Sequence, residues 1–157
     1  MDYANNRKQK AFSPRGVTLI ELLLVVAIMA IILSSAYPLG AGFLARNNFK
    51  NKINETVNSL RIAQLNSISG KEAVSWGVNV DSNQITLFSG TSYSSRNPVY
   101  DEVYDIPPSV SANPVPIEVV FDRLTGNPNS SATIVISSDS GESASVYINE
   151  VGIVDVN

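Results

Sequence analysis

The chain has 157 residues, enough for one folded domain with a short segment attached to it. It contains no cysteine and no histidine, which excludes disulfides and thiolate metal sites and removes the most common general base and metal ligand, so we expect no cofactor, no metal and no enzymatic activity. The net charge of −3 hides eleven carboxylates against three basic residues in residues 70–157, and such an acidic region disfavours nucleic-acid binding, which requires lysine and arginine.

Residues 1–16 form a basic N-terminal segment. They include four basic residues and one aspartate and show no hydrophobic periodicity. The segment ends with Pro14 and Gly16, which both disfavour a helix. We therefore expect a flexible leader ahead of the folded chain.

Residues 17–39 are the most hydrophobic part of the chain. Apolar residues run without interruption from Leu22 to Leu33, and Glu21 is the only charge in the whole segment. A helix rises about 1.5 Å per residue, so the segment is long enough to cross a hydrocarbon core of roughly 30 Å. We therefore expect a transmembrane helix here.

Three interpretations account for this hydrophobic segment. A secretory signal peptide would be cleaved after it, and Ser34-Ser35-Ala36 supplies the small residues of such a cleavage site. A plain signal anchor explains the length but gives Glu21 no role, although a charge at the centre of a spanning helix costs about 2.5–3.5 kcal/mol and less near its ends. The third interpretation gives this carboxylate a function.

The run Arg15-Gly16-Val17-Thr18-Leu19-Ile20-Glu21, followed at once by the apolar segment, resembles the N-terminal motif of type IV pilins, a family that includes the pseudopilins of type II secretion. The resemblance implies that a prepilin peptidase cuts between Gly16 and Val17 on the cytoplasmic side and then methylates the amino terminus of Val17. Glu21 would become the fifth residue of the mature chain. The resemblance also implies a single-pass protein of the inner membrane, with its leader in the cytoplasm and its head outside, that enters a periplasmic or extracellular filament.

The partners implied by the resemblance are other pilin-like subunits in a homo- or hetero-filament, prepilin peptidase, the inner-membrane assembly platform and the membrane itself. Cleavage would leave an ammonium group on Val17, and Glu21 of a neighbouring subunit would offset part of the cost of burying that charge. We therefore predict that Glu21 sets the axial register during assembly. Val17 stands where phenylalanine or methionine is more usual in the family, and Ala30 stands where many pilins have glycine.

Residues 40–70 are predicted to continue the helix after a kink. Pro38, Gly40 and Gly42 weaken the helix at this point, and Pro38 falls where pilins commonly have a helix-breaking proline. Apolar residues then recur at intervals of three to four, which predicts an amphipathic helix that packs one stripe on a head. These residues are Phe49, Ile53, Val57, Leu60 and Ala63. Gly70 is the predicted stop.

Residues 71–157 change to alternating periodicity, which predicts a small antiparallel β-sheet head and therefore an α+β fold with a long N-terminal helix. Within residues 90–116, a long connection contains one short edge strand. The predicted strands are 73–81, 84–89, 101–106, 117–124, 132–137, 144–148 and 153–156, and the first two form a hairpin. Turns are predicted at 125–128 and 139–141.

The segment from Phe121 to Val156 loosely resembles the H-type pseudopilins and the fimbrial-T minor pilins. In those proteins a phenylalanine–turn–glycine element precedes two strands and a terminal strand that contains glycine. The matching residues are Phe121, Gly126, Ile134, Ile136, Ile148, Gly152 and Val154. A generic β core explains the same residues, so both interpretations stay open.

The head shows no catalytic constellation. Asp101, Glu102 and Asp105 lack the regular ligand spacing of a calcium loop, and a solvated acidic face is the simpler interpretation. Three tyrosines of the connection either form a contact patch or pack back on their own sheet. They are Tyr93, Tyr100 and Tyr104.

Three functions are therefore compatible with the sequence. The first is a structural subunit, major or minor, of a type IV pilus or a type II secretion pseudopilus. The second is a binding module on the same scaffold, such as an adhesin or a DNA-uptake minor pilin, although DNA binding would need Lys71, Arg96 and Arg123 to cluster on one surface. The third, an anchored hydrolase with a carboxylate pair, is disfavoured by the missing histidine and cysteine.

Overall fold

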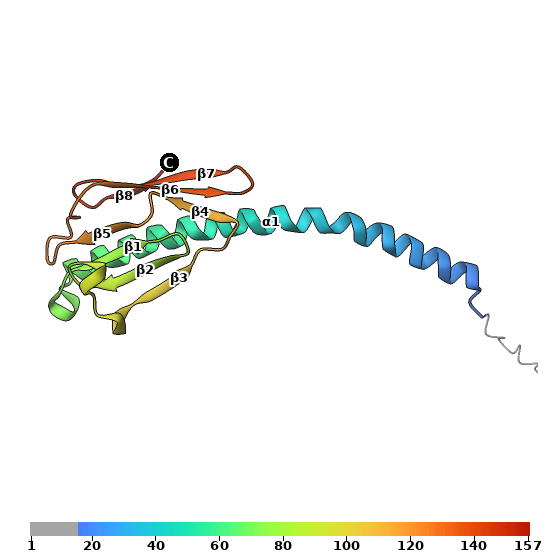
Figure 1. Cartoon of the computed structure of the whole chain (residues 1–157), viewed down its shortest axis with the longest axis horizontal. Coiled ribbons are helices and arrows are strands. Elements are labelled where there is room, and N and C mark those ends of the chain that lie inside the picture. The colour runs from blue at the N-terminus through green and yellow to red at the C-terminus, as the bar shows by residue number, and fades with distance from the viewer. Residues whose placement is uncertain (1–15) are drawn as a thin grey trace, which may run out of the picture. The chain divides into compact units, whose positions relative to one another are not determined.

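The computed structural model describes residues 16–157, apart from the side chains of residues 35–41. The predicted leader lies outside this range except for Gly16. The chain divides into two compact units, Met1–Leu39 and Gly40–Asn157. Helix α1, Leu19–Ile68, begins in the first unit and ends in the second (Figure 1). The long N-terminal helix predicted from residue 17 to about residue 68 is confirmed.

Within the second unit, one stripe of α1 is buried. Phe49, Val57, Leu60 and Ala63 are buried, and Ile53 packs against them while half-buried. Their spacing of three to four residues places them on one side of a helix with 3.6 residues per turn. The predicted amphipathic stripe is confirmed.

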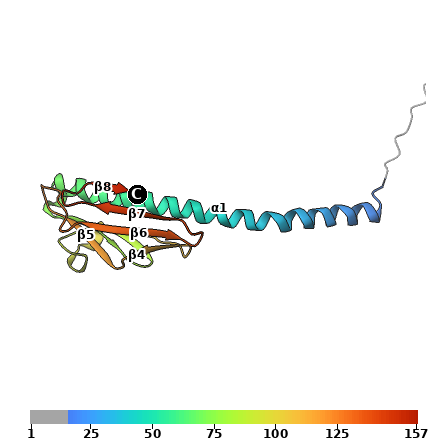
Figure 2. The ribbon, with the colours of Figure 1, turned by 90° about the horizontal axis from the view of Figure 1, so that it is seen from above.

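The described residues form two four-stranded antiparallel sheets (Figures 1 and 2). The first sheet has the order β3-β2-β1-β5 and contains β1 Trp76–Val80, β2 Gln84–Ser89, β3 Glu102–Asp105 and β5 Ile117–Phe121. The second has the order β4-β6-β7-β8 and contains β4 Val110–Asn113, β6 Ala132–Ser138, β7 Ser143–Ile148 and β8 Val154–Val156. Short 3-10 helices connect some of these elements: η1 Lys71–Ala73, η2 Tyr93–Ser95 and η3 Pro98–Tyr100.

The α+β class and the antiparallel head are confirmed, but the head contains two sheets rather than one. Strand β4 was not predicted, because its four residues lie among prolines and only Val110 is fully buried. It is an edge strand, where nearby proline is tolerated. Residues 73–75 and 122–124 were predicted as strand ends and lie outside β1 and β5.

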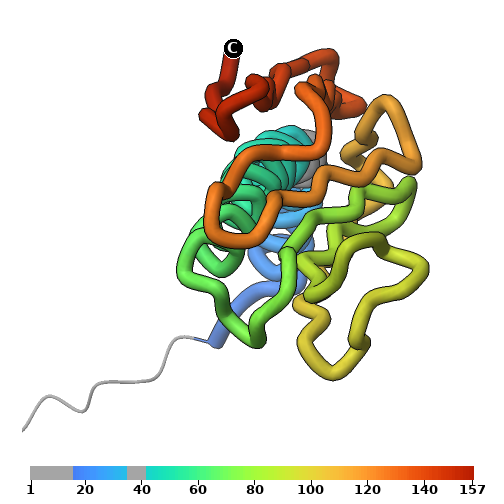
Figure 3. Tube along the Cα trace, turned by 90° about the vertical axis from the view of Figure 1, so that its left-hand side faces the viewer, coloured from blue at the N-terminus to red at the C-terminus, as the bar shows by residue number. Residues whose placement is uncertain are grey.

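Both sheets share one hydrophobic core with α1. Figure 3 looks along the helix and shows strands of both sheets around it. Val78 and Leu87 contribute from the first sheet, and Ile134 and Val146 from the second, each at most 1% exposed. Leu60 of α1 is fully buried in the same cluster. The head is therefore a single packed body in which the helix supplies apolar surface to both sheets.

Ser67 joins the end of α1 to the first sheet. Its hydroxyl donates to the carbonyl oxygen of Phe121 at 2.9 Å and accepts from the backbone N–H of Trp76 at 2.9 Å. The carbonyl oxygen of Ser67 accepts from the N–H of Leu124. The helix ends one residue later, and Gly70 follows in the left-handed conformation expected of a stop.

Gly126 and Gly152 let two turns approach α1 closely. Both have positive φ, 72° and 83°, and an added Cβ would collide with Ile68 at Gly126 and with the amide nitrogen of Gln64 at Gly152. That amide donates to the carbonyl oxygen of Gly126 at 3.1 Å. The two glycines are thus required by close packing as well as by backbone conformation.

Candidate functional site

The candidate site at the N-terminal end of α1 begins with a helix cap. Gly16, Val17 and Thr18 precede the helix, which starts at Leu19. The Thr18 hydroxyl accepts from the backbone N–H of Glu21 at 3.3 Å, and its carbonyl oxygen accepts from the N–H of Leu22 at 3.2 Å. Thr18 is therefore the N-cap, a role that the Thr-x-x-Glu spacing signals but that the sequence analysis did not identify.

The Gly16–Val17 peptide, the predicted cleavage position, lies outside the helix. Val17 is 71% exposed, Gly16 is also exposed, and an added Cβ at Gly16 would meet no atom within 4 Å. Exposed backbone without helical hydrogen bonds is the kind of segment that proteases cut most readily. The geometry is compatible with the predicted cleavage, which itself stays a prediction.

Every described side chain from Gly16 to Ser34 is exposed, including that of Glu21. The exposed apolar residues occur on all sides of the helix rather than in one stripe, from Leu19, 82% exposed, to Leu33, 70% exposed. A helix that is apolar all round is normally buried, in a large core or a membrane. This segment therefore presents a large apolar surface for contacts outside the chain.

The predicted helix kink lies at the boundary of the two units. The backbone of α1 is helical throughout Leu19–Ile68, but the side chains of Pro38 and residue 40 are outside the described set. Gly42 is exposed, and a Cβ there would meet nothing within 4 Å. The kink stays a prediction.

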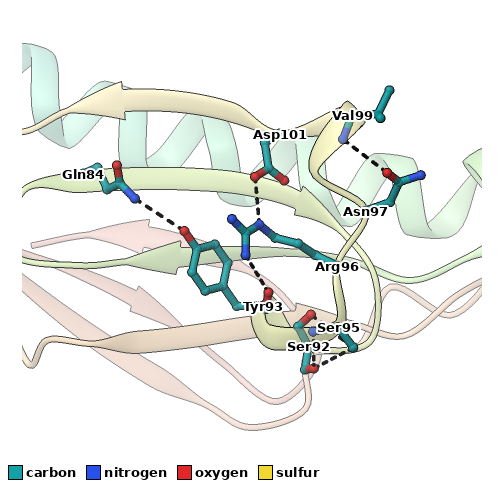
Figure 4. Close-up of polar contacts among 8 residues, drawn as sticks. All are labelled: Gln84, Ser92, Tyr93, Ser95, Arg96, Asn97, Val99 and Asp101. Atoms are coloured by element: carbon teal, nitrogen blue, oxygen red, sulfur yellow. Dashed lines mark hydrogen bonds and ion pairs between the residues drawn. The ribbon is translucent and has the colours of Figure 1, made fainter.

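The three carboxylates of the predicted acidic face, Asp101, Glu102 and Asp105, do not form a single site. Asp101 pairs with Arg96 at 2.8 Å, and a carboxylate oxygen of Glu102 accepts from the Tyr104 hydroxyl at 3.1 Å. Figure 4 shows Arg96 between Asp101 and Tyr93, whose carbonyl oxygen accepts from the guanidinium at 2.8 Å. No group of three or more carboxylates placed to hold a metal ion occurs among the described residues.

The three tyrosines of the connection pack back on the head. Tyr93 meets Phe88 edge-on with a centroid separation of 5.5 Å, and the Arg96 guanidinium lies 3.8 Å from the Tyr93 ring centroid. Tyr100 meets Trp76 at 6.1 Å. The Tyr100 hydroxyl donates to Glu72 at 3.0 Å, and this hydrogen bond raises the pKa of Tyr100. Arg96 is thus engaged within the head.

Comparison with known protein families decides the class of the N-terminal segment. Residues 12–37 match the prokaryotic N-terminal methylation motif, a match that includes Gly16, Val17 and Glu21. The chain carries the N-terminal motif of type IV prepilin-like precursors. No curated protein and no solved structure matches it.

The match stops at residue 37, before the head. Phe121, Ile134 and Ile148 are fully buried, which agrees with their role in a β core and does not distinguish an H-type pseudopilin from another pilin-like protein. The H-type and fimbrial-T assignment stays a prediction.

The predicted transmembrane segment, residues 17–39, is described with its side chains only to Ser34. Within the part of the chain that the structure describes, no helix is long and apolar enough to cross a membrane. A single-pass topology is therefore part of the proposal below. The predicted roles of Gly16, Val17 and Glu21 in cleavage, methylation and assembly are also taken up there.

Proposed function

We propose that this prepilin-like chain is a structural subunit of a type IV pilus or a type II secretion pseudopilus. Prepilin peptidase cuts between Gly16 and Val17 and methylates the new terminus of Val17. The apolar part of α1 anchors the subunit in the inner membrane with the head outside, and the assembly platform then moves it into a filament with other pilin-like subunits. The match of residues 12–37 to the N-terminal methylation motif carries this proposal.

The exposed helix surface supports an assembly role. The second unit has a core of its own, to which only the part of α1 beyond residue 42 contributes described residues. The apolar surface from Leu19 to Leu33 therefore needs another environment, which lipid supplies before assembly and neighbouring helices supply afterwards. The same apolar surface serves both environments, so one segment accounts for membrane anchoring and for filament packing.

Glu21 has a specific role in this proposal. Its backbone N–H is held by Thr18, which places Glu21 in the first turn of the helix. A carboxylate there is favoured by the partial positive charge of the helix N-terminus. In the filament, the methylated ammonium of Val17 from one subunit meets Glu21 of a neighbour, and the pair offsets part of the desolvation cost of both charges. Apolar packing alone would tolerate a shift along the helix axis, whereas this pair selects one register.

The proposal assigns no catalytic activity to the chain. The carboxylates of the acidic segment make hydrogen bonds and ion pairs within the head, as shown by Arg96 with Asp101 and Tyr104 with Glu102. A hydrolase would need a carboxylate pair in a shared cleft with a substrate. A filament subunit needs none.

Intact mass spectrometry of the protein extracted from membranes tests the proposal. The expected mass is that of residues 17–157 plus one methyl group. Gly16→Val is expected to retain the leader, because a branched side chain at the cleaved peptide obstructs the peptidase, whereas the matched leader variant Ser13→Val is processed normally. A mature chain that starts after Ala36, or a chain that keeps its leader in a host with active prepilin peptidase, would refute the proposal.

A further inference from the structure

The first sheet has a polar row on the face turned away from α1. Val78 and Val80 of β1 point into the core, so Asn79 between them points to the opposite face. In register, Asn79 lies opposite Thr86 of β2 on one side and Glu118 of β5 on the other. Three polar side chains therefore stand next to one another across three strands.

A pocket of about 490 Å³ opens beside this row. We call it the Asn79 pocket. Its lining comes from β1 and the turn that follows it, from the segment that contains η2, and from the start of β5. The lining residues are Asn79, Asp81, Tyr93, Ser94, Pro116 and Glu118. Its volume lies in the range of roughly 300–1,000 Å³ that is typical of small-ligand sites.

The wall of the Asn79 pocket is held in place by the head itself. The backbone N–H of Tyr93 donates to a carboxylate oxygen of Glu118 at 3.1 Å. The Tyr93 hydroxyl accepts from the amide of Gln84 at 3.4 Å, as Figure 4 shows. Arg96 stacks on the Tyr93 ring and pairs with Asp101. These contacts fix the segment that contains η2. This wall of the pocket is therefore an ordered part of the head.

Asn79 is the observation that points to a ligand. It is only 5% exposed and lines the pocket, and no side-chain hydrogen bond joins its amide to the described residues; the amide is not one of the buried atoms without a partner, so it faces the open pocket. Its carbonyl oxygen and its NH₂ group are therefore both available to hydrogen-bond to a group bound in the pocket.

The charged residues that line the pocket indicate which kind of chemical group binds there. Asp81 and Glu118 are carboxylates, and no lysine or arginine lines the pocket. Arg96, the nearest basic residue along the connection, is held by Asp101 and the Tyr93 carbonyl. Two negative charges repel an anion and attract a cation, while the Tyr93 ring and Pro116 provide apolar surface.

We propose that the Asn79 pocket binds an arginine or lysine side chain of a protein partner. The cationic head donates hydrogen bonds to Asp81 and Glu118 and to the amide oxygen of Asn79, and the methylene stem lies against Tyr93 and Pro116. Charge-assisted hydrogen bonds of this kind are roughly twice as strong as neutral ones, and guanidinium matches carboxylates bidentately. The site lies on the head and is separate from the assembly role of Glu21.

Nuclear magnetic resonance of the full chain in detergent micelles tests this site. The probe is the peptide acetyl-Gly-Arg-Gly-amide, and the matched probe contains citrulline, which has the shape of arginine without its charge. We expect saturable shifts of the Asn79 side-chain amide and of Tyr93 with the arginine probe, weaker binding at higher salt, and binding to the citrulline probe that is about tenfold weaker.

Two variants separate the pocket from the general acidity of the head. Asp81→Asn is expected to weaken arginine binding about tenfold, whereas Asp139→Asn, a matched change in another exposed hairpin turn, leaves it unchanged. Equal binding of both probes, or equal loss in the two variants, would overturn the proposal. Saturable binding of methyl glycosides at Asn79 without arginine binding would also overturn it, in favour of a neutral carbohydrate site. Each readout is independent of leader cleavage.

Discussion

Helix α1 contains two regions that are both helical but differ in the burial of their side chains. From Leu19 to Ser34 every described side chain is exposed, although most are apolar. From residue 42 to Ile68 a narrow stripe is buried by the strands of the head, and Leu60 and Ala63 are completely inaccessible. The comparison teaches that helix formation is local, whereas burial depends on what the rest of the molecule or its partners supply.

The largest expected effect concerns Glu21, in the region that the head does not cover. Glu21→Ala is expected to be cleaved and inserted normally but to be lost from filaments, because the Val17 ammonium of a neighbour then has no partner. Shear fractionation and crosslinking in cells measure the incorporation. Glu55→Ala, a change of one carboxylate in the packed half of α1, is the matched control and should still assemble. Normal incorporation of Glu21→Ala would contradict the assembly role.

The next effect tests the difference between the two regions directly. Leu60→Ala, at a fully buried position, is expected to destabilise the head by about 2–5 kcal/mol. Leu23→Ala, at a position 64% exposed, should change the stability of the head by less than about 0.5 kcal/mol. Denaturant unfolding followed by the fluorescence of Trp76, the single tryptophan and only 1% exposed, reports on the head. Equal losses would show that the two regions unfold as one.

A smaller effect sharpens the account of how the packed region is held. Gly152→Ala forces a Cβ toward Gln64 of α1 at a φ of 83°, whereas Gly141→Ala has a similar φ of 86° but no neighbour within 4 Å. Gly141→Ala should cost about 1–2 kcal/mol from backbone strain alone. Gly152→Ala should cost a further amount of about 1–3 kcal/mol from overpacking. The same unfolding assay measures both, and similar costs would show that the turn does not press on the helix.

The smallest expected effect concerns the pKa of Tyr100, whose hydroxyl donates to Glu72. The hydrogen bond to Glu72 raises the pKa of Tyr100, so the stabilisation from this pair is present below the ordinary tyrosine pKa of about 10 and is lost as the pH rises through the higher folded value. Glu72→Gln should therefore move the tyrosinate absorbance transition of Tyr100 to lower pH. The transition is assigned by its absence in Tyr100→Phe. An unchanged midpoint in Glu72→Gln would show that the hydrogen bond does not control this group.

Much of the fold could be read from periodicity. The apolar spacing from Phe49 to Ala63 predicted the buried stripe, and alternation predicted most strands, because side chains repeat every 3.6 residues in a helix and every two in a strand. The division into two sheets could not be read, since alternation does not say which strands pair. Strand β4 was missed because its polar residues and the prolines around it match a connection as well as an edge strand.

The candidate sites differ in the same way. The motif around Gly16, Val17 and Glu21 was visible because its residues are adjacent in sequence, whereas the capping role of Thr18 was missed although the Thr-x-x-Glu spacing signals it. Ser67 could not be identified, because its two backbone partners, Trp76 and Phe121, are brought to it only by folding.

The order of residues alone establishes a prepilin-like N-terminus, a long helix and a β-rich head, because each depends on interactions between near neighbours along the chain. Folding alone decides that the head has two sheets, that glycine turns press on α1, and that Asn79 lies unpaired in an acidic pocket with Glu118. These features depend on contacts between segments far apart in the sequence, whose free energies arise only once a shared core brings them together.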